Sequence, residues 1–524
     1  MTGGDQKKHI AKAAGLMSLA TLISRILGYV KDMMLARFFG ATGTADTFFV
    51  AFRIPNLLRE LFAEGSMSAA FIPVLSEYQT KHGRQEAERL VRITFTFISL
   101  VVGLVCILGI VFSPLIVAAI APGFLSMPAK FSLTVVLTRV MFPFLLFVSL
   151  AALVMGSLNA RRVFFIPAFA PAMLNITIIA SVLFFAYRIE QPILAVAIGV
   201  TAGGLTQFAF QLPSFFRKSY TLRPEYDFRH PGLKKMALLV MPATMGMAVA
   251  QINIFVSTIL ASYLEEGSIT YLYYSMRLIQ FPIGMFGVAM GMAVLPALSE
   301  HAVKGDYDGL REDFSFAIRL LFFITIPAMV GLIALREPIV NILFQRGEFD
   351  YTATVGTAQA LLFYSIGIWS VVGVRMVTVS FYSMQDTKTP VKVAVAALAA
   401  NVLLSIVLMQ PLKHSGLALA NSIASGINFL VLFMFLRKKL KRVDGRKIAS
   451  SFMRSLSAAI PMGLAGGMLL HGKLWQVSGY TVQKVFYLSG TMALCLAIYF
   501  VLSYMLKSEE FSYILKIVKQ KVKS

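Results

Sequence analysis

Charged residues are scarce in this chain. They make up 14% of its 524 residues, whereas hydrophobic residues make up 57% and the mean hydropathy is +0.75. A soluble chain of this length carries about 25% charged residues and fewer apolar ones. Apolar runs long enough to cross a bilayer recur from one end to the other. The composition excludes a set of soluble domains and predicts an all-α polytopic membrane protein.

Acidic residues are fewer still, with 25 Asp and Glu against 48 Lys and Arg. The net charge of +23 does not indicate a nucleic-acid partner, because the basic residues lie in short gaps between apolar runs rather than on one polar surface. The chain has only two cysteines, Cys106 and Cys495, both inside apolar runs, and its six histidines show no ligand spacing. We therefore expect no disulfide, metal site or cofactor. The first apolar run is too long for a signal peptide and is expected to be retained.

Fourteen transmembrane helices are predicted, with the second broken at Pro55. Their approximate ranges are 11–38, 45–80, 89–119, 131–158, 164–187, 192–215, 234–262, 268–299, 314–335, 355–382, 390–411, 415–437, 449–471 and 482–506. Alternate gaps, such as "RKKLKRVDGRK", hold most of the Lys and Arg, whereas the opposite gaps hold few. The positive-inside rule then places both termini in the cytoplasm.

An internal repeat divides the chain. "FRIPNLLRELFAEGSMSAAFIPVLSEY" from residue 52 resembles "MRLIQFPIGMFGVAMGMAVLPALSEH" from residue 276, which aligns Arg53 with Arg277. Two six-helix halves that enter from the same side form a parallel repeat with a central cavity between them. The sequence thus predicts an N-terminal lobe at 1–218 and a C-terminal lobe at 219–447. Two extra helices follow at 448–507, and an amphipathic basic tail occupies 508–524.

Several charges fall inside the predicted spans. A cation at mid-bilayer that faces lipid costs roughly 2.5–3.5 kcal/mol. We therefore expect the cations inside the predicted spans to face a hydrated cavity. These cations are Arg25, Lys31, Arg53, Arg59 and Arg277. On the first helix, helical spacing aligns Arg25 with Asp32 and Ser24 with Lys31. On the second helix, it aligns Arg53 with Glu60 and Glu64, and Asp46 lies near the start of that helix.

Two interpretations of these charges stay open. The acids and cations can pair with one another as structural ion pairs, or the excess of cations can bind an anion. Arg binds phosphate oxygens in a bidentate manner, so the second interpretation indicates an exporter or flippase of a phosphate-bearing anion.

The motifs together resemble a known family. They are "SRILGYVKD", "ADTFFVAFRIPNLLRELFAEGSMSAAFIPVLSEY", "APGF", "PAFAPAMLN", "YYSMRLIQFPIGMFGVA", "LPALSE", "FYSMQDTKTPVK" and "PLKHSGLALA". Over nearly the whole chain this set resembles the MurJ (MviN) family of lipid II flippases, within the multidrug/oligosaccharidyl-lipid/polysaccharide exporter superfamily. The resemblance implies movement of lipid-linked peptidoglycan precursor from the cytoplasmic to the periplasmic leaflet by alternating access, in cell-wall biogenesis.

The resemblance also implies residue roles. The family's essential cations correspond to Arg25, Lys31, Arg59 and Arg277, which would hold the pyrophosphate, and its cavity acid corresponds to Asp46. Ser24 and Asp46 would assist with polar substrate contacts or gating, and Arg53 would add a further substrate contact. Asp32, Glu60 and Glu64 would serve gating or ion pairing. Two departures affect the fine detail: Lys31 stands where the family often has Arg, and Met276 and Gln280 stand where some relatives have acids.

The resemblance sets the remaining expectations. The protein is expected to be a monomer in the bacterial inner membrane and to bind lipid II, membrane lipids and cell-wall synthesis proteins. Helices 13 and 14 would form a groove for the lipid tail or serve only as peripheral packing, and the basic tail would lie on the anionic inner surface. An inside-negative potential favours expulsion of an anion, and the coupling ion is not determined.

Three other functions fit these residues less well. A multidrug exporter of the same superfamily favours cationic drugs, so acids should dominate its cavity. A flippase for another lipid-linked glycan shares the charge logic but not these motifs. A membrane glycosyl- or phosphotransferase needs acids placed for metal or base chemistry, and no such cluster is present in the sequence. We therefore expect a transporter and not an enzyme.

Overall fold

The computed structural model describes residues 3–60 and 66–523, and the side chains within them except those of 3–14, 66–69, 241–250, 518 and 521–523. These residues form helices, with no strand among them, which confirms the all-α class. By their contacts they divide into two compact units, Met1–Tyr263 and Leu264–Ser524. Glu64 lies outside the described residues.

The described residues of the first unit form nine α-helices of the N-terminal half and a tenth that follows a linker. They are α1 (Gly3–Phe39), α2 (Gly43–Arg59), α3 (Ser66–Lys81), α4 (Gly83–Val111), α5 (Ser113–Ile120), α6 (Pro128–Met141), α7 (Pro143–Ala160), α8 (Phe165–Phe185), α9 (Ile193–Arg217) and α10 (Pro231–Ala261), with a 3₁₀ turn η2 (Pro122–Ser126).

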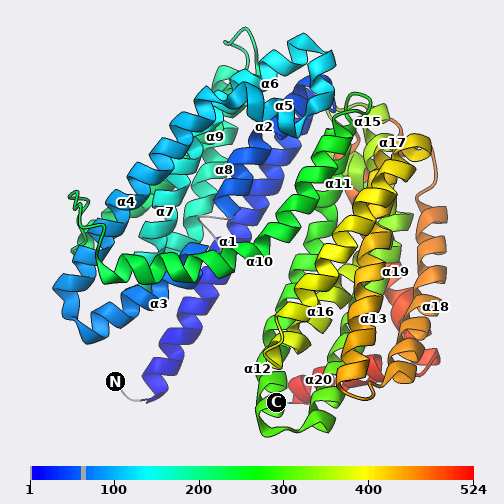
Figure 1. Cartoon of the computed structure of the whole chain (residues 1–524). Coiled ribbons are helices and arrows are strands. Elements are labelled where there is room, and N and C mark those ends of the chain that lie inside the picture. The colour runs from blue at the N-terminus through cyan, green and yellow to red at the C-terminus, as the bar shows by residue number, and fades with distance from the viewer. Residues whose placement is uncertain (1–2, 61–65, 524) are drawn as a thin grey trace. The chain divides into compact units, whose positions relative to one another are not determined.

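Small residues allow close helix packing in this unit. A Cβ at Gly203 of α9 would lie 2.6 Å from the Leu174 side chain of α8, so the glycine lets the two helices approach closely there. Small residues at such contacts are typical of helices that associate in lipid. Helix α8 also packs against α1, and α7 packs against both α9 and α4, as the blue-to-cyan helices of Figure 1 show. A buried core centred on Phe71, Leu90 and Leu153 joins α3, α4 and α7.

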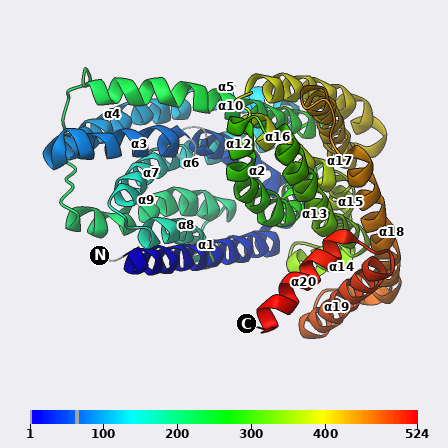
Figure 2. The ribbon, with the colours of Figure 1, turned by 90° about the horizontal axis from the view of Figure 1, so that it is seen from below.

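Helix α10 packs within the first unit. It contacts α3, α4 and α5, and Figures 1 and 2 show it lying along α3. The predicted lobe boundary at 218/219 rests on the sequence repeat, whereas the contact boundary falls between Tyr263 and Leu264. The helix that begins the second repeat thus belongs, by its contacts, with the first unit.

The second unit contains the remaining helices. They are α11 (Ser268–Pro282), the π-helix η3 (Ile283–Val288), α12 (Ala289–Lys304), α13 (Tyr307–Ala334), α14 (Arg336–Phe344), α15 (Tyr351–Ile366), α16 (Ile368–Ser383), α17 (Lys388–Lys439), α18 (Gly445–Leu469), η4 (Lys473–Trp475), α19 (Thr481–Met505) and α20 (Glu509–Lys523). An aromatic cluster joins α13, α16, α17 and α18 through Phe322, Trp369, Phe429 and Phe452.

Several predicted helices are divided in the structure. The predicted helix 89–119 is α4 followed by α5, and 131–158 is α6 followed by α7, because Pro114 and Pro143 lack the backbone N–H that would continue the helix. The predicted pair 390–411 and 415–437 is the long α17, which is interrupted at Lys413 with φ 51° and ψ −133°.

Among the described residues, eight segments are long and apolar enough to cross a membrane, and a ninth arises if α15 and α16, bent by 41°, form one span. The eight are Gly83–Val111, Pro128–Ala160, Phe165–Phe185, Ile193–Arg217, Ser268–Lys304, Tyr307–Ala334, Lys388–Lys439 and Thr481–Met505. The multi-pass architecture is therefore confirmed, and the number fourteen stays a prediction.

Candidate functional site

Helix α1 carries the charges of "SRILGYVKD" in two different environments. The Arg25 side chain is exposed, whereas the Asp32 carboxylate is completely buried and lies 3.0 Å from the Lys31 ammonium. The Ser24 carbonyl accepts a hydrogen bond from the Asn175 side chain of α8 at 3.3 Å. Helix α8 therefore fixes α1 at the level of Ser24 and Arg25, and the Arg25 guanidinium extends from a backbone that is held in place.

Asp46, near the start of α2, is paired with a cation that the sequence analysis did not include among the site residues. Its carboxylate accepts a hydrogen bond at 3.2 Å from the Lys130 ammonium of α6, and the side chains are 2% and 9% exposed. Lys130 also lies 4.4 Å from the centroid of the Phe124 ring. A buried carboxylate is tolerated when a cation offsets its desolvation, and Lys130 does this for Asp46.

The C-terminal end of α2 holds a polar network. The Asn56 side chain donates to Glu60 at 3.0 Å and accepts from the Arg59 Nε at 3.1 Å, and the Arg59 guanidinium lies 3.8 Å from the Glu60 carboxylate. The other Glu60 oxygen accepts from Gln251 of α10 at 2.6 Å. Arg53 lies half-buried two turns earlier on α2. Arg59 is thus oriented by neighbours from its own helix, and that helix end is bound to α10.

Two arginines occupy membrane-spanning helices of the second unit. Arg277 is half-buried on α11, a few residues before Pro282 and the π-helix η3. Arg375 lies in the middle of α16 with its side chain exposed. Sequence reasoning missed Arg375, although it is a charge inside the predicted apolar helix 355–382, the same signal that identified Arg25.

The structure brings several of the predicted site residues into contact. Arg59 lies beside Glu60, Lys31 lies beside Asp32, and Asp46 lies beside Lys130. Sequence reasoning missed Lys130 because a lysine in a short outer gap carries no signal of its partner. Over the described residues, no group of three or more His, Cys, Asp or Glu is placed to hold a metal ion.

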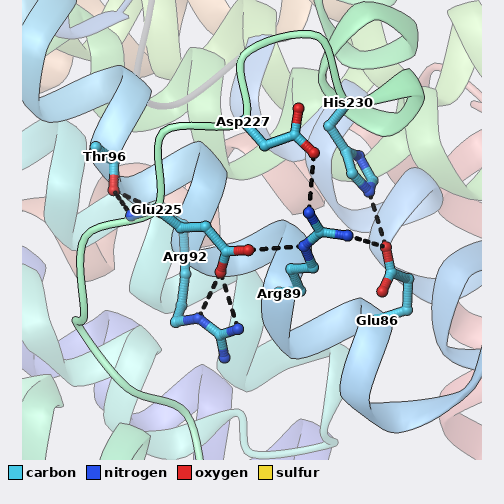
Figure 3. Close-up of polar contacts among 7 residues, drawn as sticks. All are labelled: Glu86, Arg89, Arg92, Thr96, Glu225, Asp227 and His230. Carbon is cyan, nitrogen blue, oxygen red and sulfur yellow. Dashed lines mark hydrogen bonds and ion pairs between the residues drawn. The ribbon is translucent and has the colours of Figure 1, made fainter.

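A further charge network fastens the linker between α9 and α10 to α4 (Figure 3). The Glu225 carboxylate accepts hydrogen bonds from Arg89 at 2.7 Å and from Arg92 at 2.9 Å, and Arg89 also reaches Asp227 at 3.0 Å. Burial raises the pKa of the Glu225 carboxyl, but the two arginines more than offset this and hold the pKa below its ordinary value. Glu225 is therefore ionised at neutral pH.

His230 completes this network as the N-cap of α10. Its Nδ1 accepts the backbone N–H of Gly232 at 3.1 Å, so its Nε2 carries the proton and donates to Glu86 at 3.1 Å. The network fixes both the linker and the first turn of α10 to the first three turns of α4.

Comparison with known proteins identifies the family. The chain matches the family model described as "Lipid II flippase MurJ" over residues 35–506. It is 36% identical over 506 residues to a probable lipid II flippase MurJ of Vibrio cholerae, covering 94% of this chain and 95% of that protein. It is also 36% identical over 435 residues to the lipid II flippase MurJ of Burkholderia cenocepacia, covering 82% and 84% of the two chains.

Solved structures agree with this result. A lipid II flippase MurJ in an inward closed conformation superposes with a TM-score of 0.76 at 27% identity, covering 94% of this chain and 98% of that one. An inward-facing multidrug transporter of the MATE family, at a TM-score of 0.64 and 16% identity, shares the fold over 81% of this chain and 94% of its own. The chain belongs to the lipid II flippase MurJ family.

Proposed function

We propose that this chain moves lipid II from the cytoplasmic to the outer leaflet of the bacterial inner membrane by alternating access, and that cations on its membrane-spanning helices bind the pyrophosphate. Family membership supports the substrate and the reaction, which is transport and not catalysis. The observation that carries the proposal for the site is Arg25. Its side chain is exposed on α1, a helix that the sequence predicts to cross the membrane, and a permanent charge at that depth requires a hydrated environment or a bound anion.

The other proposed residues differ in their surroundings. Lys31, Arg59 and Arg277 contribute positive charge. Ser24 lies on the same helix as Lys31, and Arg53 lies on the same helix as Arg59. Lys31 and Arg59 each lie beside an acid, Asp32 and Glu60, so their charge is partly balanced until the substrate arrives. We assign Asp32 and Glu60 to ion pairing of this kind. Asp46 is bound to Lys130 and is assigned to gating at that contact rather than to the substrate.

The rest of the proposal concerns the membrane. Both termini lie in the cytoplasm, helices 13 and 14 (α18 and α19) contact the lipid tail, and the basic helix α20 lies at the inner surface, where its charges meet anionic lipid. The protein acts as a monomer that also binds cell-wall synthesis proteins. The inside-negative potential favours outward movement of the pyrophosphate.

The test measures lipid II on the outer leaflet of cells that depend on this chain. Arg25→Ala, Arg59→Ala and Arg277→Ala are compared with wild type, with membrane levels measured in parallel. Arg442→Ala is the matched control, because Arg442 is 78% exposed and forms only a long surface contact of 3.9 Å with Asp308.

We expect the three variants to accumulate normally and to leave lipid II inside, while the control exports it. Normal export of lipid II by all three variants would show that these cations do not bind the substrate. Export of a different lipid-linked glycan by the wild type, with lipid II left inside, would refute the substrate.

A further inference from the structure

Arg375 is a charged residue that the proposed site does not contain. It lies in the middle of α16, a helix that packs against α12, α13, α17 and the π-helix η3. Its side chain is exposed, and among the described residues no hydrogen bond or ion pair is formed with it. Arginine stays charged at all physiological pH values, so its guanidinium needs water or an anion.

The stem of Arg375 lies against α12. A Cβ added at Gly291 would be 3.9 Å from the Arg375 Cγ and 3.4 Å from Val379, so α12 and α16 approach closely where Gly291 lacks a side chain. Gly291 is the third residue after η3, and Gly287 within η3 contacts Val372 of the same α16 face in the same way. Single-turn π-helices occur frequently at functional sites. Arg375 thus extends from a contact that η3 and two glycines shape.

The face of α16 that carries Arg375 does not resemble a lipid-facing surface. Thr378 and Tyr382 follow Arg375 at helical spacing, and Tyr382 is also exposed. The exposed face of α17, by contrast, is aliphatic, with Leu403, Ile406 and Val407. An arginine on a lipid-facing surface at this depth would cost roughly 2.5–3.5 kcal/mol. Arg375 lies seven residues after Ile368 and eight before Ser383, and because side chains lean toward the N-terminus of their helix, its side chain leans away from the Ser383 end of α16.

Arg375 and Arg277 occupy different depths of the same helical unit. Arg375 lies beside Gly291 of α12, and at 1.5 Å per residue Gly291 is roughly 20 Å along the α11–η3–α12 axis from Arg277. With both termini in the cytoplasm, as proposed above, Arg277 lies toward the outer end and Arg375 toward the cytoplasmic end.

We propose that Arg375 is a second anion-binding residue of the transport path, which contacts the phosphate groups of the substrate on the cytoplasmic side of Arg277. This inference rests on the proposed function. An anion that crosses the membrane must pass from one cation to the next. Two guanidinium groups at different depths divide the path across the membrane into shorter steps. Arg375 provides the step nearer the cytoplasm.

The experiment uses a thiol reporter next to Arg375. Cys106 and Cys495 are replaced by Ala, and Thr378→Cys is introduced with Arg375 intact or with Arg375→Gln. The purified full chain is treated with an anionic and a cationic methanethiosulfonate, with and without lipid II. Leu403→Cys, 66% exposed on the aliphatic face of α17, is the lipid-facing control. Outer-leaflet lipid II is measured in cells with Arg375→Gln and Arg375→Lys.

We expect Thr378→Cys to react and Leu403→Cys to stay unreactive. The anionic reagent should be favoured when Arg375 is present and lose that preference with Arg375→Gln. Lipid II should protect the thiol only when Arg375 is present. Export should fall by about tenfold or more with Arg375→Gln, because this variant loses the charge-assisted bidentate contact. Export should fall by less with Arg375→Lys, because this variant keeps the charge and loses only the bidentate geometry. Should the Gln variant fail to accumulate, Arg375→Lys supplies the comparison.

An unreactive Thr378→Cys would place this face in lipid and overturn the inference. A reactive thiol that lipid II does not protect, together with normal export by Arg375→Gln, would overturn it as well. Failure of the proposed function is a separate result: wild type and Arg277→Ala would then expose equal amounts of lipid II, whatever the thiol reports.

Discussion

At the scale of single residues, the buried pair of Asp46 and Lys130 determines how α2 and α6 meet. Both side chains are nearly inaccessible, and their charged atoms lie 3.2 Å apart. Removing one member of a buried pair costs about 3–5 kcal/mol, because the other charge stays desolvated. Exposed pairs contribute much less, at about 0–1 kcal/mol. The environment of a lysine therefore decides how much its charge matters to stability.

Lys130→Met is expected to lower the free energy of unfolding by about 3–5 kcal/mol, since it keeps the length of the side chain and removes its charge. Thermal unfolding of the purified protein measures this as a lower Tm. The double variant Asp46→Asn/Lys130→Met should recover a large part of the loss. Lys304→Met is the control, because Lys304 is 64% exposed and pairs with the exposed Glu300. An unchanged Tm for Lys130→Met would show that the pair does not stabilise the fold.

At the scale of elements, the interruption of α17 depends on one close backbone contact. Beyond Lys413, the Gly416 Cα lies so near the Leu408 carbonyl that a Cβ would be 2.1 Å from its oxygen. Gly426 lies in the same helix, and a Cβ there would meet nothing within 4 Å. The same substitution at the two glycines therefore has opposite consequences.

Gly416→Ala is expected to destabilise the protein by about 1–3 kcal/mol, because the turn must open to admit the methyl group. Gly426→Ala should stabilise it by roughly 0.5–1 kcal/mol, because alanine loses less backbone entropy in a helix. Tm values of the two variants, measured side by side, test this. If both variants changed the Tm equally and in the same direction, the close contact between Gly416 and the Leu408 carbonyl would be contradicted.

At the scale of the whole molecule, the distribution of Lys and Arg predicts which loops face the cytoplasm. Asp308, in the first turn of α13 just after the loop that follows α12, is 79% exposed, and the loop before α19 contains the exposed Ser478. In a chain with Cys106 and Cys495 replaced by Ala, Ser478→Cys should react with a membrane-impermeant maleimide in intact cells. Asp308→Cys should react only after the membrane is opened.

Both thiols are labelled before and after permeabilisation. Reaction after permeabilisation shows that each cysteine can react with the maleimide once the reagent reaches it. The reverse pattern, with Asp308→Cys labelled in intact cells, would place both termini outside and would also reverse the depths assigned to Arg277 and Arg375.

The sequence by itself determined the membrane class, the all-helical fold, the family and most of the cations inside the spans. These follow from long apolar runs, from charges that interrupt them and from local motifs, all of which are contiguous in the chain. It identified Arg25 and Arg277 in this way. The same signal was present at Arg375, where it was overlooked, so that omission was not a limit of the sequence.

Only the tertiary structure decided which charges meet. Asp46 pairs with Lys130 on another helix, Glu60 accepts from Gln251 of α10, and Glu225 of the linker is held by two arginines of α4. Helical periodicity aligned Arg25 with Asp32, but the first is exposed and the second is buried beside Lys31. The physical reason is that periodicity gives the face of one helix, whereas burial and pairing depend on which second helix packs against that face.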